Sequence, residues 1–177
     1  MARHVMLNWT NLIKDEAQKR NGKYVNHFFI GIPTILLDVE KNKIKIYRVP
    51  GKLHFKASLV NPYIFLGKDL GVSINKYLGE NRNLPKPTTS NDQFNSYYGL
   101  YTRNPDIAYE LLEQGTANKF IELKPFSPRL FIYDKTFIFE CRDIDNEPSI
   151  LSTFVSAGLD ILNKFLLIIN NKRLNKI

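Results

Sequence analysis

The chain has 177 residues, of which 44% are hydrophobic and 24% are charged, and its formal net charge is +8 at pH 7. Length and composition are those of a soluble globular protein with one core, so residues 1–177 are expected to form a single domain. The single cysteine, Cys141, excludes an internal disulfide and a thiolate zinc site, and it favours a reducing cytoplasm. We expect no signal peptide and no transmembrane segment, because apolar runs are too short for either.

The positive charge is concentrated at the two ends of the chain. Residues 1–68 carry a net charge of +8, residues 69–160 carry −4, and residues 161–177 carry +4. The stretch from Lys41 to Lys68 holds seven lysine and arginine residues and no carboxylate. A block of this kind favours contact with an anionic partner.

The first half of the chain predicts one helix followed by extended segments. Hydrophobic periodicity places the helix at residues 8–21 and the strands at 25–39, 43–47, 53–59 and 63–66. Residues 79–95 are rich in Gly, Pro and Asn, and they predict a long loop that divides two halves of one core. We expect this loop to be a mobile connector, with a binding lid as the alternative.

The second half has clearer signals. It predicts a strand at 97–101, a helix from Asn104 that breaks near Gly115, a hairpin of strands 129–133 and 136–142, and a long helix capped by Ser149. The order is then α-β-β-β-(β)-loop-β-α-β-β-α. Strand pairs without intervening helices favour an antiparallel sheet, so we predict an α+β fold with helices packed on one face of the sheet.

One stretch of the second half resembles a known pattern. The aromatic strand at Tyr98 is followed by Thr-Arg-Asn-Pro-Asp-Ile-Ala-Tyr-Glu-Leu-Leu and then by a hairpin with Leu-Phe-Ile-Tyr-Asp-Lys-Thr-Phe-Ile-Phe. Over residues 97–145 this is similar to uncharacterised prokaryotic α+β domains, some of which lie beside membrane helices. The resemblance implies a domain without assigned catalytic residues.

Motifs for nucleotide binding and serine catalysis are absent from the sequence. Neither Gly-x-Gly-x-x-Gly nor a Gly-Lys-Ser/Thr loop occurs, so a dinucleotide or phosphate cradle of the usual kind is not expected. The stretch Gly71-Val72-Ser73-Ile74-Asn75 comes nearest to a nucleophile elbow, but Asn75 replaces the final glycine. We therefore expect Ser73 to begin or flank a short helix.

Candidate metal ligands are few and scattered. His4, His27 and His54 are far apart in the sequence, and we expect them to be surface residues. The alternating Asp143, Asp145 and Glu147 could bind a hard cation, but a polar turn before the last helix is the simpler interpretation. Cys141 follows Phe137 and Phe139 at strand spacing, which predicts a small buried residue. No metal, cofactor or catalytic residue is predicted.

The basic block predicts an anion-binding surface. Lys43 and Lys45 on one strand, and His54 and Lys56 on the next, occupy the sides opposite their apolar neighbours. If the two strands pair, these side chains share a solvent-facing surface, where a solvated sheet face is the plain alternative. We take the candidate residues for anionic-partner binding to be Lys43, Lys45, Arg48, His54 and Lys56.

Two further features leave alternatives open. Aromatic residues beside basic ones, as at Tyr47-Arg48 and Phe55-Lys56, could serve nucleic-acid binding, although the signature of RNA-recognition sheets is absent. In the last helix, Leu167 and Ile168 exceed what one buried stripe requires. They could face a second copy of the chain, a bilayer surface or the first helix.

These observations favour a non-catalytic binding or scaffold domain. Its basic sheet face is expected to engage an anionic partner, and a position at the cytoplasmic membrane surface follows from that interpretation. The first alternative is a carrier of a small apolar ligand in a cavity between the long helix and the sheet. The second alternative is nucleic-acid binding. An enzyme that combines His54 with the Asp143–Glu147 cluster is less favoured than either.

Overall fold

The computed structural model describes residues 2–26, 32–60, 71–76, 89–102, 104–142 and 149–174. The helices are α1 (Ala2–Lys19), α3 (Asp92–Tyr97), α4 (Pro105–Leu111), the π-helical turn η1 (Leu112–Thr116), α5 (Ala117–Glu122), the 3-10 turn η2 (Lys124–Phe126) and α6 (Ile150–Leu174). The strands are β1 (Lys23–Asn26), β2 (Pro33–Val39), β3 (Asn42–Val49), β4 (Lys52–Ser58), β5 (Gly71–Lys76), β6 (Tyr98–Thr102), β7 (Arg129–Tyr133) and β8 (Thr136–Arg142).

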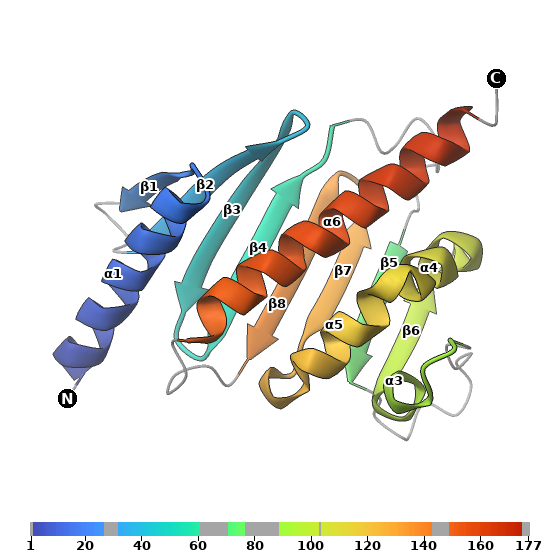
Figure 1. The fold of residues 1–177 in the computed structure, drawn as a ribbon, viewed down its shortest axis with the longest axis horizontal. Coiled ribbons are helices and arrows are strands. Elements are labelled where there is room, and N and C mark those ends of the chain that lie inside the picture. Colours follow the sequence, from blue (N-terminus) through green and yellow to red (C-terminus); the bar gives the residue numbers. More distant parts are fainter. Residues whose placement is uncertain are drawn as a thin grey trace.

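The eight strands form one antiparallel sheet in the order β1-β2-β3-β4-β8-β7-β5-β6. Figure 1 shows the helices on one face of this sheet: α1 runs beside β1 and β2, α6 crosses the centre, and α4 and α5 lie on the far side of α6 from α1. The predicted α+β class, with helices packed on one face, is confirmed.

Alternation in β3 and β4 decides which side chains face the helices. Ile46 lies opposite Phe55, and both are buried beneath the helical layer. Because successive strand residues point to opposite faces, Lys45 and Lys56, which also lie opposite each other, point to the other face. The predicted strands at 43–47 and 53–59 and the hairpin at 129–142 are confirmed.

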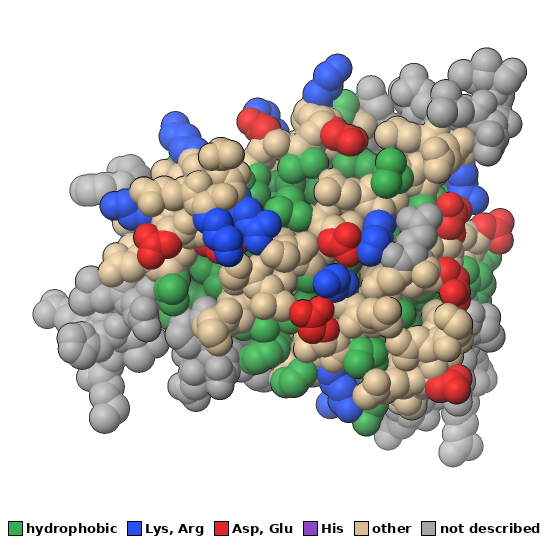
Figure 2. All heavy atoms as spheres, in the orientation of Figure 1, with side chains coloured by type: hydrophobic (Ala, Val, Ile, Leu, Met, Phe, Trp, Pro, Cys, Tyr) green, Lys and Arg blue, Asp and Glu red, His purple; other side chains and the backbone are tan. Residues whose placement is uncertain are grey.

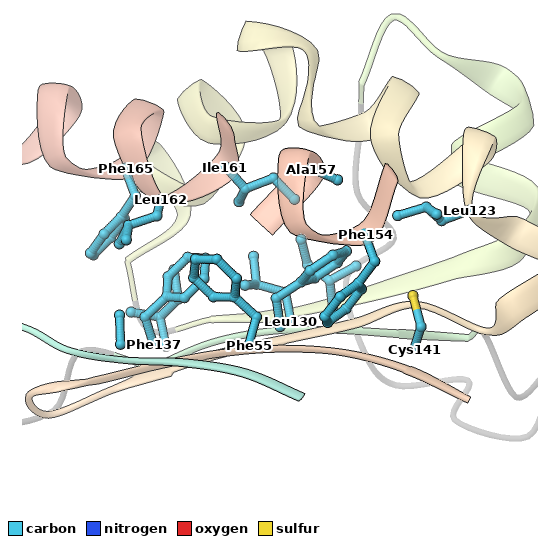
Figure 3. Packing of buried hydrophobic residues seen from close by; sticks show 14 of the residues in the cluster. Phe55, Leu123, Leu130, Phe137, Cys141, Phe154, Ala157, Ile161, Leu162 and Phe165 are labelled. Atoms are coloured by element: carbon cyan, nitrogen blue, oxygen red, sulfur yellow. The ribbon is translucent and has the colours of Figure 1, made fainter. Parts of the chain in front are cut away.

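Side chains fill the space between α6 and the sheet. Figure 3 shows Phe154, Ile161 and Phe165 of α6 lying over Phe55 and Phe137 of the strands, and all five are fully buried. The approach is close, since a Cβ atom built on Gly158 would lie 2.6 Å from Cδ2 of Phe55. An apolar ligand therefore has no room at this contact, and a carrier function needs a different site.

Some elements differ from the sequence-based expectations. The extended stretch at 25–39 contains two strands, β1 and β2, and Ser73 lies inside strand β5 rather than at a helix start. The described end of the predicted 79–95 loop includes the start of α3, whose Asn91 side chain accepts a hydrogen bond from the Phe94 backbone N–H at 2.9 Å. Residues 77–88 and the predicted strand at 63–66 lie outside the described residues.

The long helix α6 is unusually apolar. By length and composition alone its segment Ile150–Lys172, with a mean hydropathy of 1.5, could cross a bilayer, and half of the apolar window is buried within the fold. Ile168 is fully buried, whereas Leu167 is 55% exposed. Of the two surplus residues, only Leu167 is therefore available to a partner.

Cys141 is fully buried on the helix-facing side of β8, as its strand spacing predicts. Burial raises the pKa of its thiol far above the usual range, and the nearby Glu140 raises it further. The thiol is thus protonated at neutral pH and behaves as a small apolar side chain.

Candidate anion-binding face and groove

The sheet face opposite the helices is strongly basic. Its cationic side chains, identified by strand register and hereafter called the basic face, are Lys23, Lys43, Lys45, Lys52, Lys56, Arg129 and Arg142. Within the described strands the same face carries two carboxylates, Asp38 and Glu140. On the helix-covered side, Figure 2 shows acidic and basic side chains interspersed. One ion pair of α6 joins Lys164 Nζ to Asp160 Oδ2 at 2.7 Å.

Four of the five predicted anion-binding residues lie on this face. Lys43, Lys45, His54 and Lys56 all occupy the side of the sheet away from the helices. The assignment of Arg48 to the same surface is wrong. Its guanidinium carbon lies 4.9 Å from the ring centroid of the buried Trp9 of α1, so Arg48 packs on the helix-covered side.

Like charges stand directly opposite each other at two places on the basic face. Lys45 pairs in register with Lys56, and Lys52 pairs with Arg142. Directly opposite side chains in an antiparallel sheet have Cβ atoms about 4.5–5.5 Å apart, and like charges there destabilise the sheet. The fold gains nothing from these pairs, and a bound anion would relieve the repulsion.

A groove opens at the edge of the sheet beside the β2–β3 hairpin. It has a volume of about 580 Å³, which is within the usual range of small-molecule sites. Strand β1 pairs only with Pro33–Leu36, so no described strand covers the outer edge of Leu37–Val39. Apolar side chains that line the groove are Leu36, Leu37, Val39, Ile44 and Leu159.

The rim of the groove carries four cations and one carboxylate. Two of the cations are already paired: Lys43 Nζ lies 2.8 Å from Asp38 Oδ1, and Arg20 Nε donates to Glu16 Oε1 at 2.9 Å. The other two, Lys23 and Lys45, have no carboxylate partner in the described part of the chain. They flank Leu36 in strand register, so two unpaired ammonium groups border an apolar side chain.

His54 lies at the centre of the basic face. Its ring stacks on Tyr47, with centroids 5.0 Å apart and an interplanar angle of 11°. Desolvation lowers the pKa of His54 below its ordinary value of 6.5, Glu140 opposes this shift, and Lys52 and Arg142 add to it. Burial and then Glu140 raise the pKa of Tyr47. Both rings are therefore neutral at pH 7.

This environment predicts a pH-dependent stability. The unfolded chain protonates His54 near pH 6.5, whereas the folded protein does so only at lower pH, so the unfolded state binds more protons between the two values. The free energy of unfolding must fall as the pH decreases through this window. We expect His54→Gln to lose less stability than the parent between about pH 7.5 and about pH 5.5 in urea unfolding. An equal loss of unfolding free energy in the parent and in His54→Gln would contradict the lowered pKa of His54.

Several predicted candidates cannot be placed at the site. His27, Asp143, Asp145 and Glu147 lie outside the described residues, as does the side chain of His4. No group of three or more His, Cys, Asp or Glu residues in the described ranges is arranged to hold a metal ion.

Sequence reasoning missed the partners that β7 and β8 contribute to this face. Glu140 lies opposite His54 on one side and opposite Arg129 on the other, and Arg142 lies two residues farther along β8. Alternation with Phe139 and Cys141 could have placed Glu140 and Arg142 on the polar side. Their proximity to His54 depends on the long-range pairing of β4 with β8.

Comparison with known proteins gives a similarity of fold but none of sequence. No family model matches the chain, and no curated protein matches its sequence. Among solved structures, the fold is similar to the crystal structure of the mycobacterial trehalose monomycolate transport factor A, TtfA, with a TM-score of 0.59 and 8% sequence identity. The match covers 90% of this chain and 95% of the TtfA chain. At this identity, the similarity concerns the fold alone.

Proposed function

We propose that this protein is a non-catalytic binding domain for an amphiphile with an anionic end. The observation that carries the proposal is the groove beside the β2–β3 hairpin, in which apolar side chains meet Lys23 and Lys45, two lysines without a carboxylate partner among the described residues. An acyl chain would pass round the uncovered sheet edge at Leu37–Val39, between Leu159 on the helix side and Leu36 on the basic face, and the anionic end would lie between the two ammonium groups. The fold similarity to TtfA, described as a transport factor for trehalose monomycolate, supports a carrier role for an apolar ligand.

The proposal joins the two favoured sequence-based hypotheses at one place. The basic face supplies the attraction for an anion, and the groove supplies the apolar contact that the filled core beneath α6 does not. Burial of apolar surface contributes about 25 cal/mol per Å², whereas exposed charges are screened by salt. The acyl chain of the ligand should therefore provide most of the binding affinity. The two lysines should provide the selectivity for a negatively charged end.

Calorimetric titration with dodecanoate tests this function. We expect saturable binding of one dodecanoate per protein, with acetate and neutral dodecyl maltoside each at least about tenfold weaker, because each lacks one of the two required contacts. Lys45→Glu and Leu159→Gln should each weaken dodecanoate binding by about tenfold. Lys14→Glu, which changes an exposed lysine of α1 outside the groove, is the matched control and should bind as the parent does.

Three outcomes would overturn the proposal. Equal binding of acetate and dodecanoate would show a simple anion site, and equal binding of dodecyl maltoside would show a site without charge selectivity. Binding of a single-stranded oligonucleotide that depends on Lys45, without dodecanoate binding, would favour the nucleic-acid alternative. The proposal allows two cases, a protein that binds at a membrane surface and a carrier of free amphiphiles, and vesicle flotation separates them. A membrane-bound protein floats with anionic but not with neutral vesicles, whereas a carrier floats with neither.

A further inference from the structure

A second cluster of charged side chains lies on the basic face, away from the groove. Glu140 stands at its centre, with His54 and Arg129 opposite it on the two neighbouring strands. Arg142 follows two residues later on β8, and Lys52 lies opposite Arg142. Three permanent cations thus surround one carboxylate. None of these residues lines the groove at β2.

Glu140 does not saturate these cations. The Glu140 side chain is only 10% exposed, yet its contacts are long: Oε1 lies 3.5 Å from Arg142 Nη2, and Oε2 lies 3.6 Å from His54 Nδ1. Charge-assisted hydrogen bonds are usually about 2.7–2.9 Å long. No ion pair between Glu140 and its register partner Arg129 occurs among the described contacts. The cluster therefore retains positive charge that its own carboxylate leaves unused.

Two guanidinium donors in this cluster also lack acceptors. The Nε atoms of Arg129 and Arg142 are buried, and neither has a hydrogen-bond partner among the described atoms. A buried donor without an acceptor is unfavourable, because it has lost its water without a replacement. These two donors, together with the opposed charges of Lys52 and Arg142, leave an anion acceptor unsupplied by the described part of the chain.

We propose that Lys52, Arg129 and Arg142 form a binding site for a tetrahedral oxyanion of the phosphate or sulfate class, with Glu140 as a built-in competitor for the same cations. The planar fork of an arginine matches two oxygens of such an anion, and a dianion balances more of the local charge than a carboxylate does. Glu140 holds the arginines in place when the site is empty. This proposal does not depend on the groove, because the two sites share no residue.

Calorimetric titration with inorganic sulfate at constant ionic strength tests the site, because sulfate stays a dianion throughout the working pH range. We expect saturable 1:1 binding above the response to chloride. Arg142→Gln should weaken sulfate binding at least about tenfold, as expected for the loss of a charged fork. Glu140→Gln should strengthen it about fivefold, because the competing charge is removed while the side-chain size is kept. A purely structural role for Glu140 predicts no gain.

Controls separate this site from the groove and from misfolding. Lys23→Gln should weaken dodecanoate binding and leave sulfate binding unchanged. Fluorescence of the buried Trp9 reports whether each variant is folded, and Arg129→Gln replaces Arg142→Gln if the latter does not fold. The proposal is overturned if chloride matches sulfate, if the folded arginine variant binds sulfate as the parent does, or if Glu140→Gln weakens binding.

A free ion and a lipid headgroup offer the same chemistry, and two further arms distinguish them. Inorganic phosphate tests the free ion. Vesicles that contain phosphatidic acid present the monoester dianion, and phosphatidylglycerol vesicles present a diester with a single charge as the comparison. Glu140→Gln should strengthen binding of inorganic phosphate if the ligand is a free ion, and binding to phosphatidic acid vesicles if the ligand is a lipid headgroup. Binding of both vesicle types that is insensitive to Arg142→Gln counts against the site.

Discussion

The Phe139→Ala protein is expected to unfold with a free energy about 3–5 kcal/mol lower than that of the parent, which is the usual cost of removing a buried phenylalanine side chain. Phe139 is fully buried in the middle of β8. Its ring stacks on Phe154 of α6 at 5.2 Å and meets Phe120 of α5 edge-on at 5.9 Å. The side chain therefore joins two helices to the sheet. Urea unfolding followed by fluorescence of the single tryptophan, Trp9, measures the loss.

Phe131→Ala is the matched control. Phe131 lies on the neighbouring strand β7, opposite Ile138, and it is half-buried on the side of the sheet away from the helices. Because its ring is not enclosed by a helix, we expect a clearly smaller loss than at Phe139. Equal losses at the two positions would mean that the face opposite the helices is packed as tightly as the core, which would contradict the open basic face.

The Gly158→Ala protein is expected to lose up to about 2 kcal/mol of stability, because overpacking a core typically costs about 1–3 kcal/mol and the higher helix propensity of alanine offsets about 1 kcal/mol of that cost. The added Cβ atom would lie 2.6 Å from Cδ2 of Phe55 and 2.9 Å from both Cε2 and Cγ. Alanine favours a helix over glycine by about 1 kcal/mol, so the net loss must come from the clash. Thermal and urea unfolding check the sign, since helix propensity alone predicts a gain.

A double-mutant cycle shows whether Phe55 is the cause. In a Phe55→Leu background the branched, smaller side chain leaves room for the new methyl group, so Gly158→Ala should cost less there than in the parent. Gly71→Ala is the control, because a Cβ atom at Gly71 would meet nothing within 4 Å. Additive losses at Gly158 and Phe55, or a comparable loss at Gly71, would contradict a direct contact between α6 and β4.

Local sequence patterns were sufficient to predict the strands and helices whose own residues alternate or repeat clearly. The alternation of Ile44 and Ile46 with lysines predicts β3, and Ser149, the predicted cap of the last helix, directly precedes α6, which begins at Ile150. The same alternation gives the faces of Lys43, Lys45 and Lys56. It also places Arg48 with Ile46 rather than with the lysines, so the error at Arg48 came from grouping by charge instead of by strand parity.

Strand β5 shows why other elements were missed. In Gly71–Lys76 the apolar Val72 and Ile74 alternate with the polar Ser73 and Asn75, a short and weak signal that also fits a turn or a helix start. Its status as a strand comes from its neighbours β6 and β7, which follow much later in the chain. Backbone hydrogen bonds to such distant segments stabilise a strand that local propensity does not favour.

The sequence by itself determined the α+β class, the basic character of one sheet face and the absence of the usual catalytic motifs. Only the tertiary structure decided that α6 fills the space above Phe55, that a groove opens past the short strand β1, and that Glu140 faces both His54 and Arg129. The physical reason is the range of the interactions. Alternation and capping depend on neighbouring residues, whereas strand order and helix packing depend on which distant apolar surfaces bury one another.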